Sequence, residues 1–410
     1  MTRRILIITQ WFDPEPTFKG LLFAKELVAR GFEVEVITGF PNYPGGTLYD
    51  GYRIKLIQKE TIEGVSVTRV PLFPSHDKNK LGRIANYISF ALSSLLYGLM
   101  FAKRPDVIYA YHPPLTVSIS AVIIKLFRQV PVVLDIQDMW PDTLKATGMI
   151  SNRRFLGFVS KVCNSIYSSV TKIVVLSPGF KNLLVTRGVP DSKIEIIYNW
   201  ADEIALRHAA SEVPKELDSK KNFKVLFAGN VGQAQGLNVI LDAALLLKDD
   251  VPEIDFLVLG RGLQLDDLKK RKKELKLDNV YFLPAVGMEK VGSFLRSADA
   301  LLIHLNSDPL FEITIPGKTQ AYMAVGKPII MGVSGDASNL VLRADCGVCF
   351  EPEKSAALAD AVKGLILLSR SDMRRLGENA EKFYDEYLSV KVGVDCFANV
   401  FNEVIDMERS

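Results

Sequence analysis

Two runs of alternating strand and helix patterns constrain this chain of 410 residues more than any other feature of its sequence. The first run begins with the apolar segment 5–8, followed by a helix pattern at 21–30, and continues to residue 200. The second run restarts at residues 223–228 and ends with a strand pattern at 347–350. Because parallel strands need long crossover connections, usually helices, this alternation predicts α/β folds with parallel sheets covered on both faces.

The residues between the two runs predict a domain boundary. Residues 201–221 are polar and contain Pro214, so we predict a linker there. The first domain is then residues 1–200 and the second residues 222–389. Ligands of doubly wound folds bind at the carboxyl ends of the strands, so we expect the two domains to face each other across a ligand-binding cleft.

The composition is that of an ordinary globular protein in a reducing compartment. The chain is 48% hydrophobic and 24% charged, which is enough apolar material for two cores. Its four cysteines are scattered, and Cys346 and Cys349 lack the second pair or the histidines that would complete a metal site. Residues 3–4 lead directly into the first strand pattern without a signal peptide, so we expect a cytoplasmic protein.

The two halves of the chain differ in charge. Residues 1–200 hold 24 Lys and Arg against 15 Asp and Glu, a net charge of +9, and residues 201–410 hold 26 against 32, a net charge of −6, which sum to +3. A basic first half suits an anionic membrane surface or an acceptor that carries a pyrophosphate, and ordinary solvated surface charge is the alternative. We expect no nucleic-acid partner.

One uncharged segment raises the question of a membrane. Residues 84–102 contain no charged side chain, and basic residues flank them on both sides. The length is close to the roughly 20 residues of a spanning helix, but the strand patterns at 65–70 and 106–110 belong to one sheet, so both helix ends must lie on the same side. A packed helix and a helix on a bilayer surface both remain open, and we expect peripheral contact with the inner face of the cell membrane.

A loop–helix joint late in the chain indicates a binding site for phosphate. Pro316 and Gly317 interrupt the preceding segment, and Lys318 opens a helix pattern that ends before an apolar strand at 329–331. Free backbone N–H groups together with a lysine at a helix start favour an anion such as a phosphate group. An ordinary loop–helix joint without a ligand is the alternative.

Four segments, in order along the chain, resemble the retaining glycosyltransferases of family 4. They are residues 38–46 (TGFPNYPGG), 135–142 (DIQDMWPD), 228–237 (AGNVGQAQGL) and 315–330 (IPGKTQAYMAVGKPII). Within that family the chain is most similar to the bacterial O-antigen and capsule transferases for amino sugars of the L-fucosamine type. The resemblance implies the GT-B fold, with two Rossmann-like domains across a cleft and a last helix, residues 390–407, that packs back on the N-terminal domain.

The resemblance also implies a function. It is that of an EC 2.4 enzyme that moves an N-acetylated amino or deoxy sugar from a UDP-sugar, bound by the C-terminal domain, to a polyprenyl-diphosphate-linked acceptor, bound by the N-terminal domain. Such a reaction belongs to O-antigen, capsule or lipopolysaccharide synthesis. Two other functions stay open, a UDP-sugar epimerase of the same fold and a non-catalytic protein that binds nucleotide sugars.

A diphosphate leaving group needs positive groups around it. The sequence contains no Asp-x-Asp motif of the kind that holds a metal in some transferases, so we expect neither a metal nor a cofactor. We predict that Lys318 and Arg261, each just past a strand or loop end, supply the charge, although Arg261 in a solvated turn is an alternative. With Asp138 and Glu312 they make up the predicted catalytic residues.

The predicted donor contacts lie in the second domain. They are Asn230, Gly232, Gln235, Arg261, Lys318, Thr319 and Gln320. In a glycine-rich loop a backbone without a Cβ atom can approach a phosphate closely, which is the role expected for Gly232.

The chain departs from the family at two donor-binding positions. The family's pair of glutamates falls at Ile313 and Ala321, and its basic pair falls at Asn230 and Gln235. The ribose contact is therefore unassigned, and we predict that Gln320 or the nearby Glu312 replaces it.

The predicted acceptor contacts follow strand patterns of the first domain. They are Phe18, Gly20, His112, Gln137 and Trp140. Asp138 could orient a hydroxyl group of the acceptor or of the donor sugar, or it could simply cap a helix. His112 likewise could satisfy nearby backbone groups.

Overall fold

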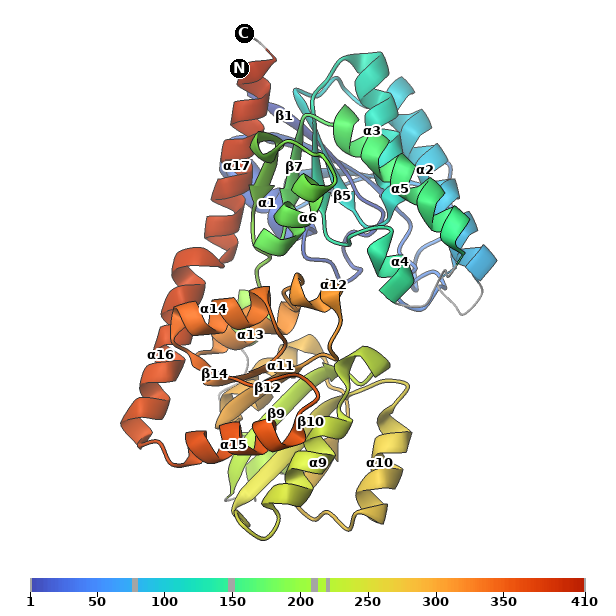
Figure 1. The fold of residues 1–410 in the computed structure, drawn as a ribbon. Coiled ribbons are helices and arrows are strands. Elements are labelled where there is room, and N and C mark those ends of the chain that lie inside the picture. The colour runs from blue at the N-terminus through green and yellow to red at the C-terminus, as the bar shows by residue number, and fades with distance from the viewer. Residues whose placement is uncertain (1, 76–79, 147–151, 208–212, 219–221, 409–410) are drawn as a thin grey trace. The chain divides into compact units, whose positions relative to one another are not determined.

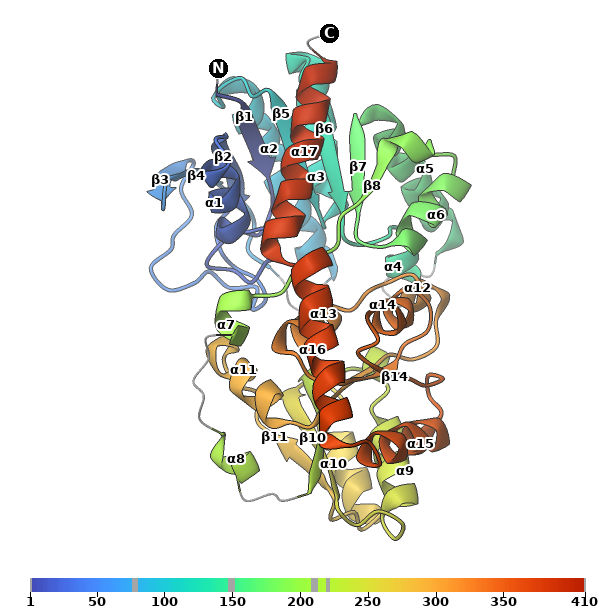
Figure 2. The ribbon, with the colours of Figure 1, turned by 90° about the vertical axis from the view of Figure 1, so that its left-hand side faces the viewer.

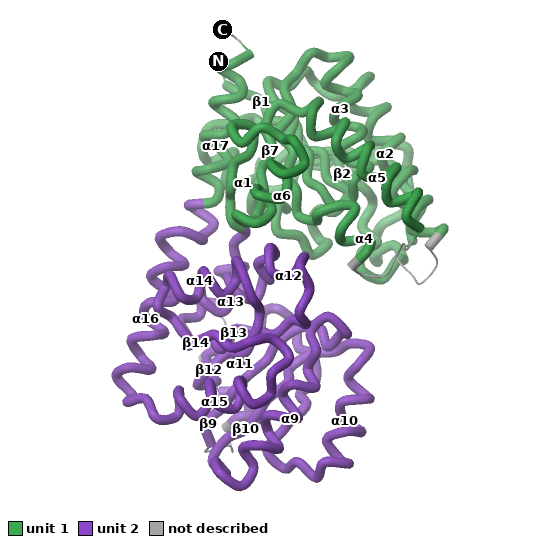
Figure 3. Tube along the Cα trace, in the orientation of Figure 1, with its two compact units in different colours: residues 1–198, 393–410 green, residues 199–392 purple. Residues whose placement is uncertain are grey.

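The computed structural model describes residues 2–75, 80–146, 152–207, 213–218 and 222–408, and the chain divides into two compact units (Figure 3). Unit 1 contains Met1–Tyr198 and Gly393–Ser410, and unit 2 contains Asn199–Val392. Each unit is built on one sheet with helices on both faces (Figure 1).

The sheet of unit 1 has eight strands in the order β3-β4-β2-β1-β5-β6-β7-β8. The strands are β1 (Arg4–Ile8), β2 (Glu33–Gly39), β3 (Gln58–Ile62), β4 (Val65–Val70), β5 (Val107–His112), β6 (Val132–Ile136), β7 (Lys172–Val175) and β8 (Ile194–Ile196). All pairings are parallel except that of β3 with β4. Glu63 and Gly64 both have positive φ, so a tight hairpin turn reverses the chain there.

The helices of unit 1 lie on both faces of this sheet (Figures 1 and 2). They are α1 (Leu21–Ala29), α2 (Lys80–Met100), α3 (Leu115–Arg128), α4 (Asp142–Ala146), α5 (Arg153–Ser169), α6 (Pro178–Thr186) and α17 (Val390–Met407), with a short 3-10 turn η1 (Asp191–Lys193). Helices α2, α3 and α5 cover one face, and α1 and α17 cover the other.

The last helix belongs to unit 1 from residue 393 onward, although it follows unit 2 in the chain. Phe397 of α17 is fully buried and contacts Phe23 of α1 and Tyr109 of β5, with ring centroids 5.1 and 5.6 Å away. Lys172 at the start of β7 forms an ion pair of 3.0 Å with Glu403. These contacts make the C-terminal helix part of the core of unit 1.

The sheet of unit 2 has six parallel strands in the order β11-β10-β9-β12-β13-β14. The strands are β9 (Phe223–Asn230), β10 (Ile254–Arg261), β11 (Val280–Leu283), β12 (Ala300–His304), β13 (Ile329–Gly332) and β14 (Gly347–Cys349). Strands β10, β12 and β13 are almost continuously buried, as are residues 225–228 of β9, which is expected for strands covered by helices on both faces.

The helices of unit 2 follow the strands in the predicted alternation. They are α7 (Glu203–Arg207), α8 (Lys215–Asp218), η2 (Gln233–Gln235), α9 (Asn238–Leu247), α10 (Leu265–Glu274), α11 (Met288–Ser297), α12 (Pro309–Glu312), α13 (Gly317–Val325), α14 (Asp336–Ala344), α15 (Ser355–Ile366) and α16 (Arg370–Tyr387). Helix α9 contacts α15, whereas α13 contacts α16 and α7.

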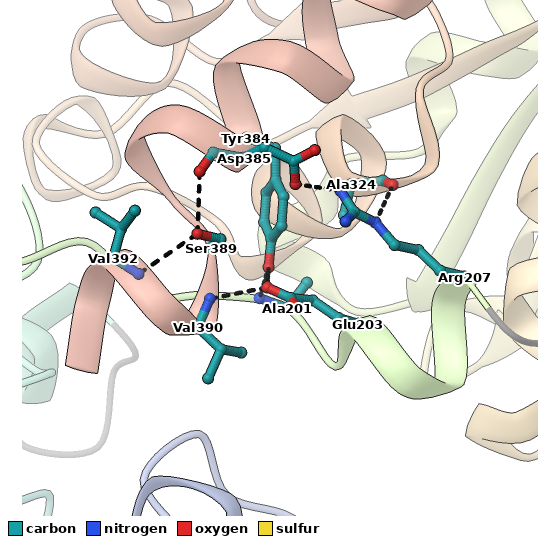
Figure 4. Close-up of polar contacts among 9 residues, drawn as sticks. All are labelled: Ala201, Glu203, Arg207, Ala324, Tyr384, Asp385, Ser389, Val390 and Val392. Atoms are coloured by element: carbon teal, nitrogen blue, oxygen red, sulfur yellow. Dashed lines mark hydrogen bonds and ion pairs between the residues drawn. The ribbon is translucent and has the colours of Figure 1, made fainter. Parts of the chain in front are cut away.

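The segment predicted as a linker begins inside unit 2, and Figure 4 shows its polar contacts. The hydroxyl of Tyr384 donates to Glu203 Oε1 at 2.9 Å and accepts from the Ala201 N–H at 3.1 Å. Glu203 Oε1 also accepts from the Val390 N–H at 2.8 Å, and the guanidinium of Arg207 lies 5.3 Å from the Tyr384 ring. In the sequence, the polar residues of this segment look like a solvated linker. Their hydrogen-bond partners, Tyr384 and Val390, lie far along the chain and are not evident from the local pattern. Residues 208–212 and 219–221 of the predicted linker lie outside the described residues.

We predict that Phe397→Ala destabilises unit 1 by about 3–5 kcal/mol, because it leaves a cavity among aromatic rings. The matched control is Asn399→Ala, an exposed position on the same helix. Urea unfolding measures the loss of stability, and amide hydrogen exchange of β1 and β5 shows whether unit 1 is the part affected. Equal urea midpoints for the two variants would contradict the assigned role of α17.

Candidate functional site

Two predicted donor-binding residues lie side by side at the carboxyl edge of the unit 2 sheet. Asn230 ends β9 and Arg261 ends β10, and the two are paired in the register of these strands. Both residues are exposed. The fold thus places one amide and one guanidinium next to each other at the edge where ligands of such sheets bind.

Lys318 reaches the same edge from the first turn of α13. Its Nζ lies 4.4 Å from the centre of the Phe227 ring in β9. Its Cε lies 2.6 Å from where a Cβ atom on Gly229 would stand, so the side chain packs directly on the end of β9. Burial lowers the pKa of Lys318 to about 8. Within the described part of the chain, no carboxylate forms an ion pair with this lysine, so the site has an unbalanced positive charge.

Two polar side chains next to Lys318 are buried without partners. Thr319 and Gln320 are 0% and 1% exposed, and neither Thr319 Oγ1 nor Gln320 Oε1 has a hydrogen-bond partner among the described residues. Unsatisfied buried polar groups are rare in folded proteins, and they often mark places that a ligand completes. Together with the free N–H groups at the start of α13, they make this joint suitable for an anionic ligand.

The glycine-rich loop after β9 differs in detail from the prediction. Gln235 Oε1 accepts hydrogen bonds from the Gly232 N–H at 3.0 Å and from Asn230 Nδ2 at 3.4 Å. A Cβ atom on Gly232 would lie 2.8 Å from Asn230 Nδ2 and 2.9 Å from Gln235 Oε1. In this structure the space beside Gly232 is therefore filled by side chains of the loop itself, and Gln235 shapes the loop.

His304, which was not among the predicted site residues, supports this loop through a hydrogen bond to its backbone. The buried ring at the end of β12 donates from Nδ1 to the Gln235 carbonyl at 2.7 Å and accepts the Glu353 N–H at Nε2 at 2.9 Å. Burial lowers the pKa of His304, although the hydrogen bond to Gln235 opposes this. A neighbour, Asn306, donates from Nδ2 to the Gln233 carbonyl at 2.9 Å. The sequence did contain one indication of this role, because His304 is a polar residue at the carboxyl end of an apolar strand.

Glu312 has no contact that defines a role. It ends the short helix α12 and is exposed, and no hydrogen bond or ion pair joins its carboxylate to another described residue. Its predicted part in catalysis or ribose binding stays a prediction.

The carboxyl edge of the unit 1 sheet brings together most of the predicted acceptor residues. His112 ends β5, and its carbonyl accepts the Gln137 N–H at 2.8 Å just after β6. The His112 ring is fully buried and lies edge-to-face with Trp140, with ring centroids 6.1 Å apart. Neither ring nitrogen has a hydrogen-bond partner among the residues that the structure describes.

The protonation of this edge follows from burial. Burial lowers the pKa of His112 to about 4, so the ring is neutral at pH 7 and can both donate and accept a hydrogen bond. Burial also raises the pKa of the half-buried Asp138 carboxyl. Gln137 differs, because its Nε2 donates to the Asp135 carboxylate at 2.6 Å and is already used within the fold.

The two predicted contacts in the loop after β1 differ in exposure. Phe18 is 44% exposed and available to a ligand. Gly20 is buried beside Asp13, whose Oδ2 accepts the Leu21 N–H at 2.6 Å at the start of α1. A Cβ atom on Gly20 would lie 2.2 Å from that oxygen, so this glycine is needed by the helix start.

Two family matches together cover most of the chain. Residues 21–200 match the family described as "Glycosyl transferase 4-like domain". Residues 210–383 match the family described as "Glycosyl transferases group 1". The chain is a glycosyltransferase.

This glycosyltransferase has relatives of similar length. It is 26% identical over 385 residues to an Escherichia coli K12 protein named as a colanic acid biosynthesis glycosyl transferase, WcaI, covering 90% of this chain and 93% of WcaI. It is 24% identical to the Pseudomonas aeruginosa protein named as the glycosyltransferase WbjE, covering 81% of this chain and 84% of that one. The crystal structure of Anabaena HepE with UDP and glucose superposes with a TM-score of 0.71 over 98% of this chain and 100% of HepE, at 16% identity. The predicted GT-B fold is thereby confirmed.

We predict that His304→Phe loosens the glycine-rich loop of this glycosyltransferase. The substitution keeps a flat ring beside Phe350 but leaves the Gln235 carbonyl and the Glu353 N–H without partners, at a cost of about 1–3 kcal/mol for each group. Hydrogen exchange of residues 231–236 at pH 7.5 should be faster in the variant, and unchanged exchange would contradict the supporting role.

The same histidine gives the wild type a pH dependence with a defined sign. Because its pKa is lower in the folded than in the unfolded state, its contribution to stability is present above pH 6.5 and is lost as the pH falls. His304→Phe should lack this loss on acidification.

Proposed function

We propose that this glycosyltransferase is a retaining enzyme that moves a sugar from a UDP-sugar to a polyprenyl-diphosphate-linked glycan. The sugar is an N-acetylated amino or deoxy sugar, and the product serves a bacterial surface polysaccharide such as O-antigen, capsule or lipopolysaccharide. One observation carries the proposal: the ammonium of Lys318 is packed on Gly229 at the start of α13 and has no counter-charge among the described residues. A nucleoside diphosphate supplies that charge.

Two similar proteins support this proposal. WcaI is named for colanic acid biosynthesis, and the HepE crystal structure contains UDP together with glucose. The UDP bound to HepE supports a nucleotide-sugar donor, and the name of WcaI supports a polysaccharide product. The donor sugar and the acceptor remain part of the proposal.

In the proposed reaction, the bond between the anomeric carbon and the diphosphate oxygen breaks while the acceptor oxygen bonds to the same face of that carbon. The acceptor proton moves to the departing diphosphate oxygen, so UDP leaves and the sugar keeps its configuration. Lys318, Arg261 and the N–H groups of the first turn of α13 stabilise the charge that grows on UDP. Because the sequence lacks an Asp-x-Asp motif, the proposal assigns this role to protein groups.

Three further residues are proposed to orient hydroxyl groups. Gln320 takes the place of the family's ribose-binding glutamate, because its Oε1 is buried without a described partner. Asp138 orients a hydroxyl of the acceptor or of the donor sugar, and Glu312 is the alternative ribose contact. Each of these assignments follows from position and chemistry, and substrate kinetics of single variants can separate them.

We predict that Lys318→Ala lowers transfer by about 100- to 1,000-fold and weakens UDP binding, because the leaving group loses its main cation. Mass spectrometry with a panel of UDP-sugars and a polyprenyl-diphosphate-sugar acceptor measures transfer, and calorimetry measures UDP affinity. The matched control is Lys270→Ala, whose side chain is 79% exposed on α10. Since burial lowers the pKa of Lys318 to about 8, UDP affinity of the wild type should fall as the pH rises above 8.

Two outcomes would overturn the proposal. One is a Lys318→Ala variant whose UDP affinity and turnover equal those of the wild type. The other is conversion of a UDP-sugar into its epimer without any acceptor, which would identify the epimerase instead.

Helix α2 of unit 1 has a buried side with both polar and aromatic residues, and an exposed side that is apolar. Asn86 and Ser94 are 1% and 0% exposed, and Asn86 Nδ2 donates to the Phe73 carbonyl at 2.7 Å. The exposed side carries large apolar residues at helical spacing: Leu81, Ile84, Ile88, Leu92, Leu96 and Met100, each at least 49% exposed. An uncovered apolar stripe of this length marks an interaction surface.

We propose that this stripe contacts the anionic surface of a lipid bilayer, which places the enzyme at the cytoplasmic face of the cell membrane. Helices α2, α3 and α5 lie side by side (Figure 1), and Phe127 of α3 and Phe158 of α5 are also largely exposed. Arg104, Arg153 and Arg154 are exposed cations on or beside these helices, which suits anionic headgroups. Within the described ranges of the chain, we find no candidate for a membrane-spanning helix.

We predict that Ile88→Glu combined with Leu92→Glu abolishes co-sedimentation with vesicles containing phosphatidylglycerol, because two charges on the stripe oppose burial in the bilayer surface. Leu263→Glu, at an 89% exposed position in unit 2, is the control and should sediment like the wild type. Equal sedimentation of all three proteins would exclude membrane contact by α2. Dimerisation lost in the double variant would instead assign the stripe to a second copy of the chain.

A further inference from the structure

An open pocket in unit 1 has no role in the reaction described so far. It has a volume of about 480 Å³, and its lining includes Pro14, Thr47, Leu48, Tyr49, Asp50 and Tyr52. Pro14 follows β1, and the other residues belong to the long connection after β2. The carboxyl ends of β1 and β2 lie on the same sheet edge as those of β5 and β6, which carry His112 and the segment with Asp138.

The connection that forms the pocket is held in a defined shape. Tyr49 donates from its N–H to the Pro41 carbonyl at 3.1 Å and from its hydroxyl to the Tyr43 carbonyl at 2.6 Å. Tyr52 donates from its N–H to the Tyr49 carbonyl at 3.1 Å. These bonds fix both pocket tyrosines relative to one another.

Two buried ionisable residues, Glu15 and Arg69, hold the connection after β2 and the adjoining loop through hydrogen bonds to backbone groups. Glu15 Oε1 accepts the N–H groups of Asn42 and Tyr43, each at 2.7 Å. Arg69 is fully buried, donates to the Asp13 carbonyl at 2.6 Å, and places its guanidinium 5.1 Å from the Tyr52 ring. A pocket with walls fixed in this way is largely preformed, which lowers the entropy cost of binding.

Several polar groups of the pocket are unused. No hydrogen bond to another described residue is found for the Asp50 carboxylate, the Thr47 hydroxyl or the Tyr52 hydroxyl. The lining contains one carboxylate and no cation, so it disfavours a phosphate group. It instead suits a neutral ligand with several hydroxyl groups and an apolar face that can lie on an aromatic ring.

We propose that this pocket is a subsite for a sugar ring of the acceptor glycan. The inference rests on the proposed function, and it adds the place where the acceptor is recognised. The apolar C–H face of the sugar lies against Tyr52 or Tyr49, and Asp50 accepts hydrogen bonds from neighbouring sugar hydroxyls. The ring is bound at the sheet edge that also holds His112, so a glycan extending from the pocket runs along that edge.

The first experiment tests the subsite without knowing the acceptor. Saturation-transfer difference NMR of the full chain with methyl glycosides of glucose, galactose, mannose and N-acetylglucosamine should show contact for at least one of them. Tyr52→Leu and Asp50→Asn should each reduce this contact by about tenfold. The controls are Tyr387→Leu and Asp249→Asn, at exposed positions of unit 2, which should behave like the wild type.

The second experiment uses the lipid-linked acceptor in the transfer assay. The acceptor KM should rise by about tenfold in Tyr52→Leu and Asp50→Asn, whereas the donor KM and the UDP affinity should stay the same. If Tyr52→Leu does not fold, as judged by its thermal unfolding, Asp50→Asn decides alone because it changes one exposed side chain.

Three outcomes would overturn the subsite: no contact with any glycoside, contact that both variants retain, or contact of UDP protons that the variants remove, which would make it a nucleotide pocket. Glycoside contact that depends on Tyr52 in a protein that neither binds UDP nor transfers sugar would support the subsite and refute the proposed function. The two proposals can therefore fail separately.

Discussion

Two paired glycines set the geometry on which the candidate donor site depends. Gly229 and Gly260 are register partners at the ends of β9 and β10, with φ of +138° and +154°. A Cβ atom on Gly260 would lie 1.9 Å from the Gly229 carbonyl oxygen, and one on Gly229 would lie 2.6 Å from Lys318 Cε. Any other residue would push the strand ends apart or displace the lysine. The enclosed ammonium therefore depends on two residues that carry no functional group.

Several residues predicted as ligand contacts have a place in the scaffold. Gln235 closes the glycine-rich loop, Gln137 donates to Asp135, and Gly20 leaves room for the Asp13 side chain at the start of α1. Short loops at strand ends must first satisfy their own backbone N–H and carbonyl groups. The groups left over, such as the ring nitrogens of His112 and the Oε1 of Gln320, are the ones that a substrate can use.

Unit 1 shows the same division between scaffold and surface. Asn86 of α2 is turned inward by its bonds to the Phe73 carbonyl and the Asn42 side chain, so the apolar side of the helix faces outward. The uncharged composition of residues 84–102 predicted that part of the helix contacts an apolar environment, but not which side of the helix does so. The pocket in the long connection after β2 exists because Glu15 and Arg69, which lie outside that connection, hold it in place.

By itself, the sequence determined the class of fold, the order of strands and helices, and the edge of each sheet that carries the polar residues. These properties are local, because hydrophobic periodicity and breaks at glycine and proline act over a few residues. Only the tertiary structure decided that residues 201–207 belong to unit 2, that His304 supports the glycine-rich loop, and that α2 exposes its apolar side. Each of these depends on partners far along the chain, such as Tyr384 for Ala201, and burial and hydrogen bonding between distant segments cannot be read from local patterns.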